Sequence, residues 1–231
     1  MTSSRDTVFA SVRRALGVTS LEAPRRQEVD GRLAGHPRGL VPARAQIPAV
    51  ERLALFKDMV VAAAASIDHL PSADEVPSAV AAYLRGRNLP PTILRGGDAR
   101  LASLPWHREP NLDVWIGASD GRQLAGLSHA FAGVAESGTL VMLSGPDNPS
   151  TLNLLPDHHL VVVDAADVAG DYESVWTRLR ERFGPGVMPR TVNWITGPSR
   201  SADIEQTLLL GAHGPRSLHV LLVGELLVGG A

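Results

Sequence analysis

The chain has 231 residues, a length that suits one large domain or one domain with an appendage. Its net charge of −2 gives no electrostatic reason to expect binding to nucleic acid or to an anionic membrane surface. It contains no cysteine, which excludes disulfides, thiolate nucleophiles, cysteine-bound zinc and iron–sulfur clusters held by these residues. The longest strongly apolar stretch, residues 59–67, is far shorter than the roughly 20 residues of a membrane span. With no apolar signal core near the first residue, we expect a cytoplasmic protein.

The first 48 residues differ in composition from the rest and are expected to form an appendage. Residues 7–16 carry apolar side chains at helical spacing and predict a short amphipathic helix that stops at Gly17. Residues 18–48 are rich in proline and glycine, and residues 1–48 hold eight arginines and four acidic residues. This composition is typical of a mobile or wrapping arm, and a docking arm for an acidic partner is the alternative. We therefore divide the chain into an arm, residues 1–48, and an α/β domain, residues 49–231.

In the second part, helical patterns alternate with short apolar runs. Helices are expected at residues 50–67, 76–87, 172–183 and 202–210, and strands at 92–94, 112–116, 139–143, 160–163, 191–195 and 218–223. The runs 160–163 and 220–223 are apolar without alternation, as expected of strands that are covered on both faces. Strands that alternate with helices predict an α/β fold with a mostly parallel sheet.

The clearest candidate site is the segment Ser199-Arg200-Ser201. It follows the expected strand 191–195 and a Gly-Pro turn, and it precedes the expected helix 202–210. Ligands of open parallel sheets bind beyond the carboxyl ends of strands. A serine cap, the free N–H groups of the helix and the arginine would together bind a phosphate or a carboxylate. The alternative is an ordinary helix cap beside an exposed arginine.

Two further segments carry candidate residues. Glu136 lies among small residues just before the strand that starts at Thr139, where backbone could approach a ligand closely. It is either a general base or nucleophile, or a solvated turn residue. His213 lies between two glycines, one of them Gly214, and either caps the preceding helix or contacts a ligand. The sequence shows no metal-binding spacing of histidines and no dinucleotide or hydrolase motif.

Three motifs in this order resemble the lactate-utilisation protein C family, whose members carry a LUD domain. They are Ala135-Glu-Ser-Gly-Thr139, Ser201-Ala-Asp-Ile-Glu205 and Gly211-Ala-His-Gly-Pro215. The resemblance covers roughly residues 85–224, and Ser137 stands where the family commonly has threonine. With these motifs, the candidate catalytic residue is Glu136, and the candidate ligand-binding residues are Gly138, Thr139, Ser199, Arg200, Ser201, Asp203, Glu205, His213 and Gly214.

The resemblance implies a three-layer α/β/α sandwich, similar to the group of ribose-5-phosphate isomerase, glucosamine-6-phosphate deaminase and the CoA-transferases. It also implies a non-redox role, beside two iron–sulfur partner proteins, in the oxidation of L-lactate to pyruvate, with an anionic small molecule as ligand. The lack of cysteine fits a subunit whose partners carry the clusters. One alternative is a stand-alone isomerase or transferase that acts on a phosphorylated, CoA-linked or folate-like substrate, with Glu136 as acid/base or nucleophile. Another is an assembly or regulatory subunit with a vestigial pocket.

Overall fold

The computed structural model describes residues 3–19, 22–201, 209–211 and 213–224. The chain forms two compact units, Met1–Leu40 and Val41–Ala231. No helix among the described residues is long and apolar enough to cross a membrane.

The first unit contains two helices. The expected first helix is confirmed as α1 (Ser4–Leu16), which begins earlier than expected because Ser3 and Asp6 cap each other's backbone N–H groups. A second helix, α2 (Ala23–Gly35), occupies part of the segment for which we expected irregular structure. Its proline lies in the first turn, where the missing N–H group costs no hydrogen bond. Neither helix contains a buried residue.

The second unit is built on a six-stranded parallel sheet with the order β1-β12-β7-β4-β2-β3. Its central strands alternate between two cores: Val161 and Val163 pack on one side of the sheet, and Leu160 and Val162 pack on the other. The prediction that this apolar run is covered on both faces is therefore confirmed. In spatial order, the strands are β1 (Ser66–Leu70), β12 (Ser217–Val223), β7 (His158–Asp164), β4 (Ala125–His129), β2 (Thr92–Arg95) and β3 (Asp113–Ile116).

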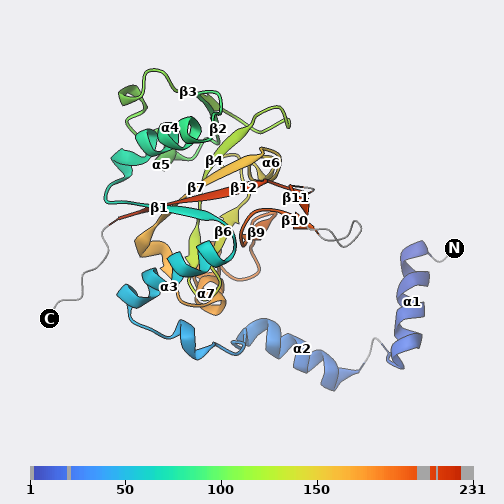
Figure 1. Cartoon of the computed structure of the whole chain (residues 1–231). Coiled ribbons are helices and arrows are strands. Elements are labelled where there is room, and N and C mark those ends of the chain that lie inside the picture. The colour runs from blue at the N-terminus through green and yellow to red at the C-terminus, as the bar shows by residue number, and fades with distance from the viewer. Residues whose placement is uncertain (1–2, 20–21, 202–208, 212, 225–231) are drawn as a thin grey trace. The chain divides into compact units, whose positions relative to one another are not determined.

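Helices cover both faces of this sheet (Figure 1). Helices α4 (Val76–Gly86) and α5 (Ala99–Ala102) pack on one face, and α3 (Ala49–Ala62) packs on the other. The short helix α6 (Ser150–Leu154) lies against β4. Among the described residues, four single 3₁₀ turns complete the connections: Ala43–Ala45, Ala73–Glu75, Trp106–Arg108 and Ala165–Asp167.

A smaller sheet packs on the same side as α3, with the order β8-β5-β6-β9. Only β5 and β8 pair in parallel, and the other two pairs are antiparallel. Helix α7 (Tyr172–Phe183) covers its outer face. Its strands are β8 (Val168–Ala169), β5 (Ala132–Val134), β6 (Thr139–Leu143) and β9 (Val192–Ile195). The whole unit is a three-layer α/β/α sandwich, as expected.

Two local expectations are wrong: the extent of the helix expected at 50–67 and the helix expected at 202–210. The helix expected at 50–67 ends at Ala62, because Ala64 takes the left-handed conformation with φ of 65° and Ser66 begins β1. The strands expected at 139–143 and 191–195 are confirmed, and they belong to the smaller, mostly antiparallel sheet. Where the helix 202–210 was expected to end, Leu209–Leu210 form strand β11, which pairs antiparallel with β10 (Arg200–Ser201). Residues 202–208 lie outside the described residues.

Candidate functional site

A pocket of about 240 Å³ lies at the amino-terminal edge of the large sheet, between the starts of β7 and β12 and the end of β9. Two backbone hydrogen bonds join the chain segments that surround the pocket. The N–H of Ser199 donates to the carbonyl of Pro215 (2.8 Å), and the N–H of Gly211 donates to the carbonyl of Ser199 (3.0 Å). We call it the amino-edge pocket. Its lining comprises Asn153, Leu154, His159, Trp194, Ile195, Thr196, Gly197, Pro198, Ser199, His213, Gly214, Pro215 and Leu218.

The turn after β9 requires glycine at position 197. Its φ is 71°, and a Cβ there would lie 2.1 Å from the carbonyl oxygen of Ala63. This close approach of backbone to the end of α3 fixes the direction in which the chain leaves β9. Ser199 and Thr196 consequently both line the pocket.

The structure brings three of the predicted ligand-binding residues together, because Ser199, His213 and Gly214 all line this pocket. Arg200 is exposed and does not belong to the lining. Successive side chains of an extended chain point to opposite sides, which separates Arg200 from Ser199. We predicted an anion site at a helix N-terminus next to Ser201. In the described residues Ser201 lies in a strand instead, paired with Leu209. Asp203 and Glu205 lie outside the described residues.

Glu136 lies apart from the amino-edge pocket. It is buried, its carboxylate accepts a hydrogen bond from the backbone N–H of Tyr172 (3.3 Å), and its own N–H donates to the carbonyl of Gly170 (3.1 Å). It is not the solvated turn residue that we considered as the alternative. Gly138, with φ of 66°, is equally constrained: a Cβ there would lie 2.5 Å from the backbone of Met59 in α3.

Thr139 connects this turn to the pocket through hydroxyl groups. Its Oγ1 lies 2.6 Å from Oγ1 of Thr196, which lines the pocket, and 2.8 Å from the hydroxyl of Tyr172. Ser137 joins the same cluster, with its Oγ 2.7 Å from Thr139 and 2.8 Å from Tyr172. These hydroxyls form a continuous chain from the Glu136–Thr139 turn to the edge of the pocket.

Two lining residues carry buried polar atoms without a partner among the described residues. They are Nδ1 of His159 and Nδ2 of Asn153, and both side chains are fully buried. The two residues are linked through Ser128, whose Oγ donates to Oδ1 of Asn153 (2.7 Å) and lies 3.0 Å from Nε2 of His159. Burial lowers the pKa of His159 to about 3, so its ring is neutral at physiological pH.

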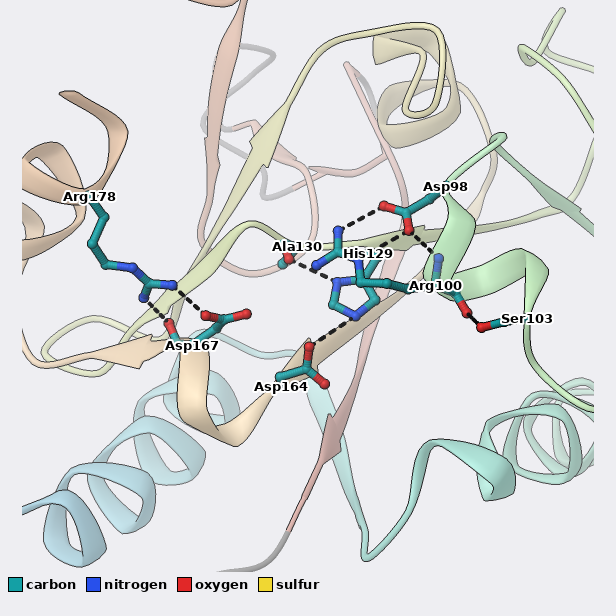
Figure 2. Close-up of polar contacts among 8 residues, drawn as sticks. All are labelled: Asp98, Arg100, Ser103, His129, Ala130, Asp164, Asp167 and Arg178. Carbon is teal, nitrogen blue, oxygen red and sulfur yellow. Dashed lines mark hydrogen bonds and ion pairs between the residues drawn. The ribbon is translucent and has the colours of Figure 1, made fainter. Parts of the chain in front are cut away.

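The opposite, carboxyl-terminal edge of the sheet carries a second group of polar side chains (Figure 2). His129 ends β4 and Asp164 ends β7, and their Nε2 and Oδ2 atoms lie 3.4 Å apart. The Nδ1 of His129 donates to the carbonyl of Ala130 (2.9 Å), which turns Nε2 towards the carboxylate. The hydrogen bond from His129 is the main reason that the pKa of Asp164 lies below its usual range.

Two ion pairs flank this histidine and aspartate. Asp98 accepts two hydrogen bonds from the guanidinium of Arg100, at 3.1 and 2.7 Å. Burial alone would raise the pKa of Asp98, but these bonds outweigh burial and lower it. On the other side, Arg178 pairs with Asp167 (Figure 2). In each pair, the positive charge of the arginine balances the negative charge of the aspartate.

The carboxyl-terminal edge also holds a cavity of about 520 Å³. We call it the carboxyl-edge cavity. Asp164 lines both this cavity and a neighbouring one of about 260 Å³ that includes His129 and Arg100. Arg52 is the one cation in the lining of the larger cavity, and it forms no ion pair within the described parts of the chain. No group of three or more side chains suited to hold a metal ion occurs in the residues that the structure describes.

Sequence reasoning missed His129, Asp164, Asn153 and His159 as site residues. The rule that ligands bind beyond strand ends could have found Asp164, because it directly follows the expected strand 160–163. His129 gave no such signal, since its strand was not expected. The free atoms of Asn153 and His159 depend on contacts between β4, α6 and β7 that no local pattern reveals.

Comparison with known proteins gives a consistent result. A family model described as the LUD domain matches residues 53–223. An uncharacterized protein of Neisseria meningitidis serogroup B is 35% identical over 54% of this chain and 52% of its own length. Lactate utilization protein C of Geobacillus thermodenitrificans is 33% identical over 63% of this chain and 66% of its own length.

Among solved structures, a DUF162 family protein from Deinococcus radiodurans superimposes with a TM-score of 0.53 at 26% identity. The match covers 77% of this chain and 99% of that protein. By contrast, the chain spans about half the length of the first curated relatives that it matches.

Proposed function

The chain belongs to the LUD-domain family, and from this premise we propose that it is a cytoplasmic, non-redox component of a system that oxidises L-lactate to pyruvate. Relatives named lactate utilization protein C, at 27–33% identity, are the observation that carries the proposal. Oxidation of lactate removes two electrons. The 231 residues contain no cysteine to hold an iron–sulfur cluster, so in this proposal the electrons pass to iron–sulfur partner proteins.

The ligand that we propose for this component is a small organic anion in the amino-edge pocket. The pocket is smaller than the roughly 300–1,000 Å³ of sites for drug-sized ligands, which suits a small metabolite. The hydroxyl of Ser199 and the imidazole of His213 line it and supply hydrogen-bond donors for a carboxylate. Arg200 follows Ser199 but is exposed, so its role in this proposal is to attract the anion rather than to contact it.

Affinity purification from the native host after growth on L-lactate tests the role directly. The tagged full chain should retain iron–sulfur proteins, and the eluate should reduce a dye in the presence of L-lactate. A Ser199→Ala variant should retain the same partners but lose most of the lactate-dependent reduction. Ser78→Ala, which removes an exposed hydroxyl from α4, serves as the control. A chain that purifies without partners and without activity would refute the role.

The carboxyl-edge cavity favours one alternative, a stand-alone enzyme of the isomerase or transferase type. Its volume of about 520 Å³ admits a phosphorylated, CoA-linked or folate-like substrate. Arg52 would bind the anionic group, and the pair of His129 and Asp164 would transfer protons in place of Glu136, which is buried elsewhere. Turnover of such a substrate by the purified chain, lost in Asp164→Asn and in Arg52→Gln, would favour this alternative.

A further inference from the structure

The edge of the large sheet formed by β1 carries a group of side chains that lies outside both cavities described above. Strands β1 and β12 pair in parallel there, in a register that places Ser66 beside His219. Alternate residues of a strand share one face of the sheet, so Asp68, two residues after Ser66, lies on the same side. No local motif marks this group, because its members meet only when two strands from distant parts of the chain pair.

His219 lies between a hydroxyl and a carboxylate. Its Nδ1 is 2.8 Å from Oγ of Ser66, and its Nε2 is 3.5 Å from Oδ2 of Asp68. The second distance is longer than a hydrogen bond, but catalytic contacts of this kind are often long before a substrate binds. The side chain of Asp68 is 61% exposed, which leaves it room to move towards the ring. A serine, a histidine and an aspartate in this arrangement form the constellation of serine hydrolases, which is recognised by geometry and not by sequence position.

The imidazole of His219 has the protonation state that a base requires. Burial lowers its pKa, and Arg87 adds to this shift while Asp68 opposes it, so the ring is neutral at physiological pH. A neutral ring carries one proton, and a carboxylate can only accept, which places this proton on Nε2. Nδ1 therefore has a lone pair that accepts the proton of Ser66. Tyr83 stacks on the ring, with the centroids 4.6 Å apart, and so restricts its orientation.

The backbone of β1 supplies a donor for a developing negative charge. The carbonyl of Leu70 accepts a hydrogen bond from Gly224, which directly follows β12, so alternate residues of β1 direct their backbone groups towards β12. The N–H group of Ile67 points the other way, to the side on which no strand of the described residues pairs with β1. Ile67 directly follows Ser66, and the N–H group after the nucleophile is a usual donor of an oxyanion hole.

We propose that Ser66, His219 and Asp68 form a nucleophilic site that hydrolyses small carboxylic esters at this edge of the sheet. Ser66 is half-buried and Asp68 is exposed, so a small ester reaches the hydroxyl directly from solvent. Neither the amino-edge pocket nor the carboxyl-edge cavity includes any of the three residues. The activity is separate from the proposed role in lactate oxidation and requires no partner protein.

The reaction has two steps. Oγ of Ser66 attacks the carbonyl carbon of the ester and its proton passes to Nδ1 of His219, while the N–H group of Ile67 stabilises the oxyanion. The bond between this carbon and the alcohol oxygen breaks, and the imidazolium returns the proton to the departing alcohol. Water then attacks the acyl group on Ser66 by the same proton route, which releases the carboxylic acid and restores the hydroxyl. Asp68 stabilises the positive ring that forms in each step.

Labelling of the purified full chain with phenylmethanesulfonyl fluoride, followed by mass spectrometry of its peptides, tests the activation of Ser66. Ser78 is the internal comparison, because it is exposed and its hydroxyl donates to a backbone carbonyl instead of an imidazole. Ser66 should react at least about a hundredfold faster than Ser78, since general-base catalysis contributes about 10²–10⁴-fold. Equal rates at the two serines, or no label on Ser66, would overturn the proposal.

Hydrolysis of p-nitrophenyl acetate by the same chain measures turnover. Ser66→Ala should reduce the rate at least about a hundredfold, whereas Ser78→Ala should leave it unchanged. Asp68→Asn alters an exposed side chain and should slow both labelling and hydrolysis about tenfold, less than the roughly 10⁴-fold loss where such an aspartate is buried. Hydrolysis that Ser66→Ala leaves intact, or labelling that Asp68→Asn does not slow, would contradict the proposed site.

Discussion

At the scale of single residues, His159 makes the protein less stable in acid. Its ring is fully buried, and desolvation lowers its pKa from 6.5 to about 3 in the folded state. The unfolded chain takes up a proton at this residue near pH 6.5. Between the two values, the unfolded state binds more protons than the folded state, so the free energy of unfolding falls as the pH is lowered. The contribution is fully present above pH 6.5 and is lost progressively towards pH 3.

We expect His159 alone to reduce the free energy of unfolding by about 2–3 kcal/mol between about pH 7 and about pH 4.5, since each pH unit below the unfolded pKa is worth about 1.4 kcal/mol. Urea denaturation at both pH values measures this difference. The His159→Phe variant should show a pH dependence that is smaller by this amount. His107 is exposed, so His107→Phe should behave like the unaltered protein. Identical pH dependence in all three proteins would show that His159 is not held neutral by burial.

At the scale of elements, helix α3 packs against both sheets. Two glycines allow it to pack closely: a Cβ on Gly133 would lie 3.0 Å from the ring of Phe56, and a Cβ on Gly138 would lie 2.5 Å from the backbone of Met59. Gly197 lies close to the end of the same helix, where a Cβ would lie 2.1 Å from the carbonyl oxygen of Ala63. Part of the Ala135–Thr139 motif is thus explained by packing, because Gly138 lets the Glu136 turn approach α3.

Two substitutions on opposite faces of α3 test this role. Phe56 is fully buried and Val61 is 59% exposed. Phe56→Ala should reduce the free energy of unfolding by about 3–5 kcal/mol through the cavity that it leaves, and Val61→Ala should change it by less than about 0.5 kcal/mol. Chemical denaturation gives both values. Similar losses from the two substitutions would mean that α3 does not depend on its buried face.

The elements that could be predicted from sequence were those with a strong local signal. The apolar runs of β7 and β12 and the amphipathic pattern of α7 have bounds close to those expected. Strand β4 could not be recognised, because Gly126 replaces the bulky residue typical of a strand: a Cβ there would lie 3.0 Å from Leu152 in α6. The β10–β11 pair depends on pairing between residues that lie eight and ten positions apart, which outweighs local helical preference.

The same distinction applies to the site. Ser199 was found because it follows an expected strand, and His213 and Gly214 were found because a motif marked them. The fold brings all three to one pocket. Asn153 and His159 complete the lining of that pocket from α6 and β7, and they are linked by hydrogen bonds through Ser128 in β4. Such a constellation exists only in the folded chain.

At the scale of the whole molecule, the two cavities lie at opposite edges of one parallel sheet. Strand β7 runs from one to the other, with His159 at the amino-edge pocket and Asp164 at the carboxyl-edge cavity. Five residues of strand correspond to about 16 Å at roughly 3.3 Å per residue. A ligand in one cavity is therefore out of reach of side chains in the other, and the two sites can be tested separately.

The division of the chain into two units also predicts the effect of truncation. Helices α1 and α2 bury no residue, so deletion of residues 1–40 should change the free energy of unfolding of the α/β unit by less than about 0.5 kcal/mol. Ala45 is buried, and a Cβ on Gly170 would lie 2.1 Å from its carbonyl oxygen. Deletion of residues 1–48 should therefore leave the unit folded but cost it roughly 1–3 kcal/mol. Equal stability of both truncated chains in urea would place Ala45 outside the core.

A crystal structure of the full chain with L-lactate is the measurement that separates the two cavities most directly. We expect the ligand in the amino-edge pocket, with its carboxylate facing Ser199 and His213. Lactate bound instead at the carboxyl-edge cavity, beside Arg52, would contradict the assignment of the pocket and favour the alternative enzyme.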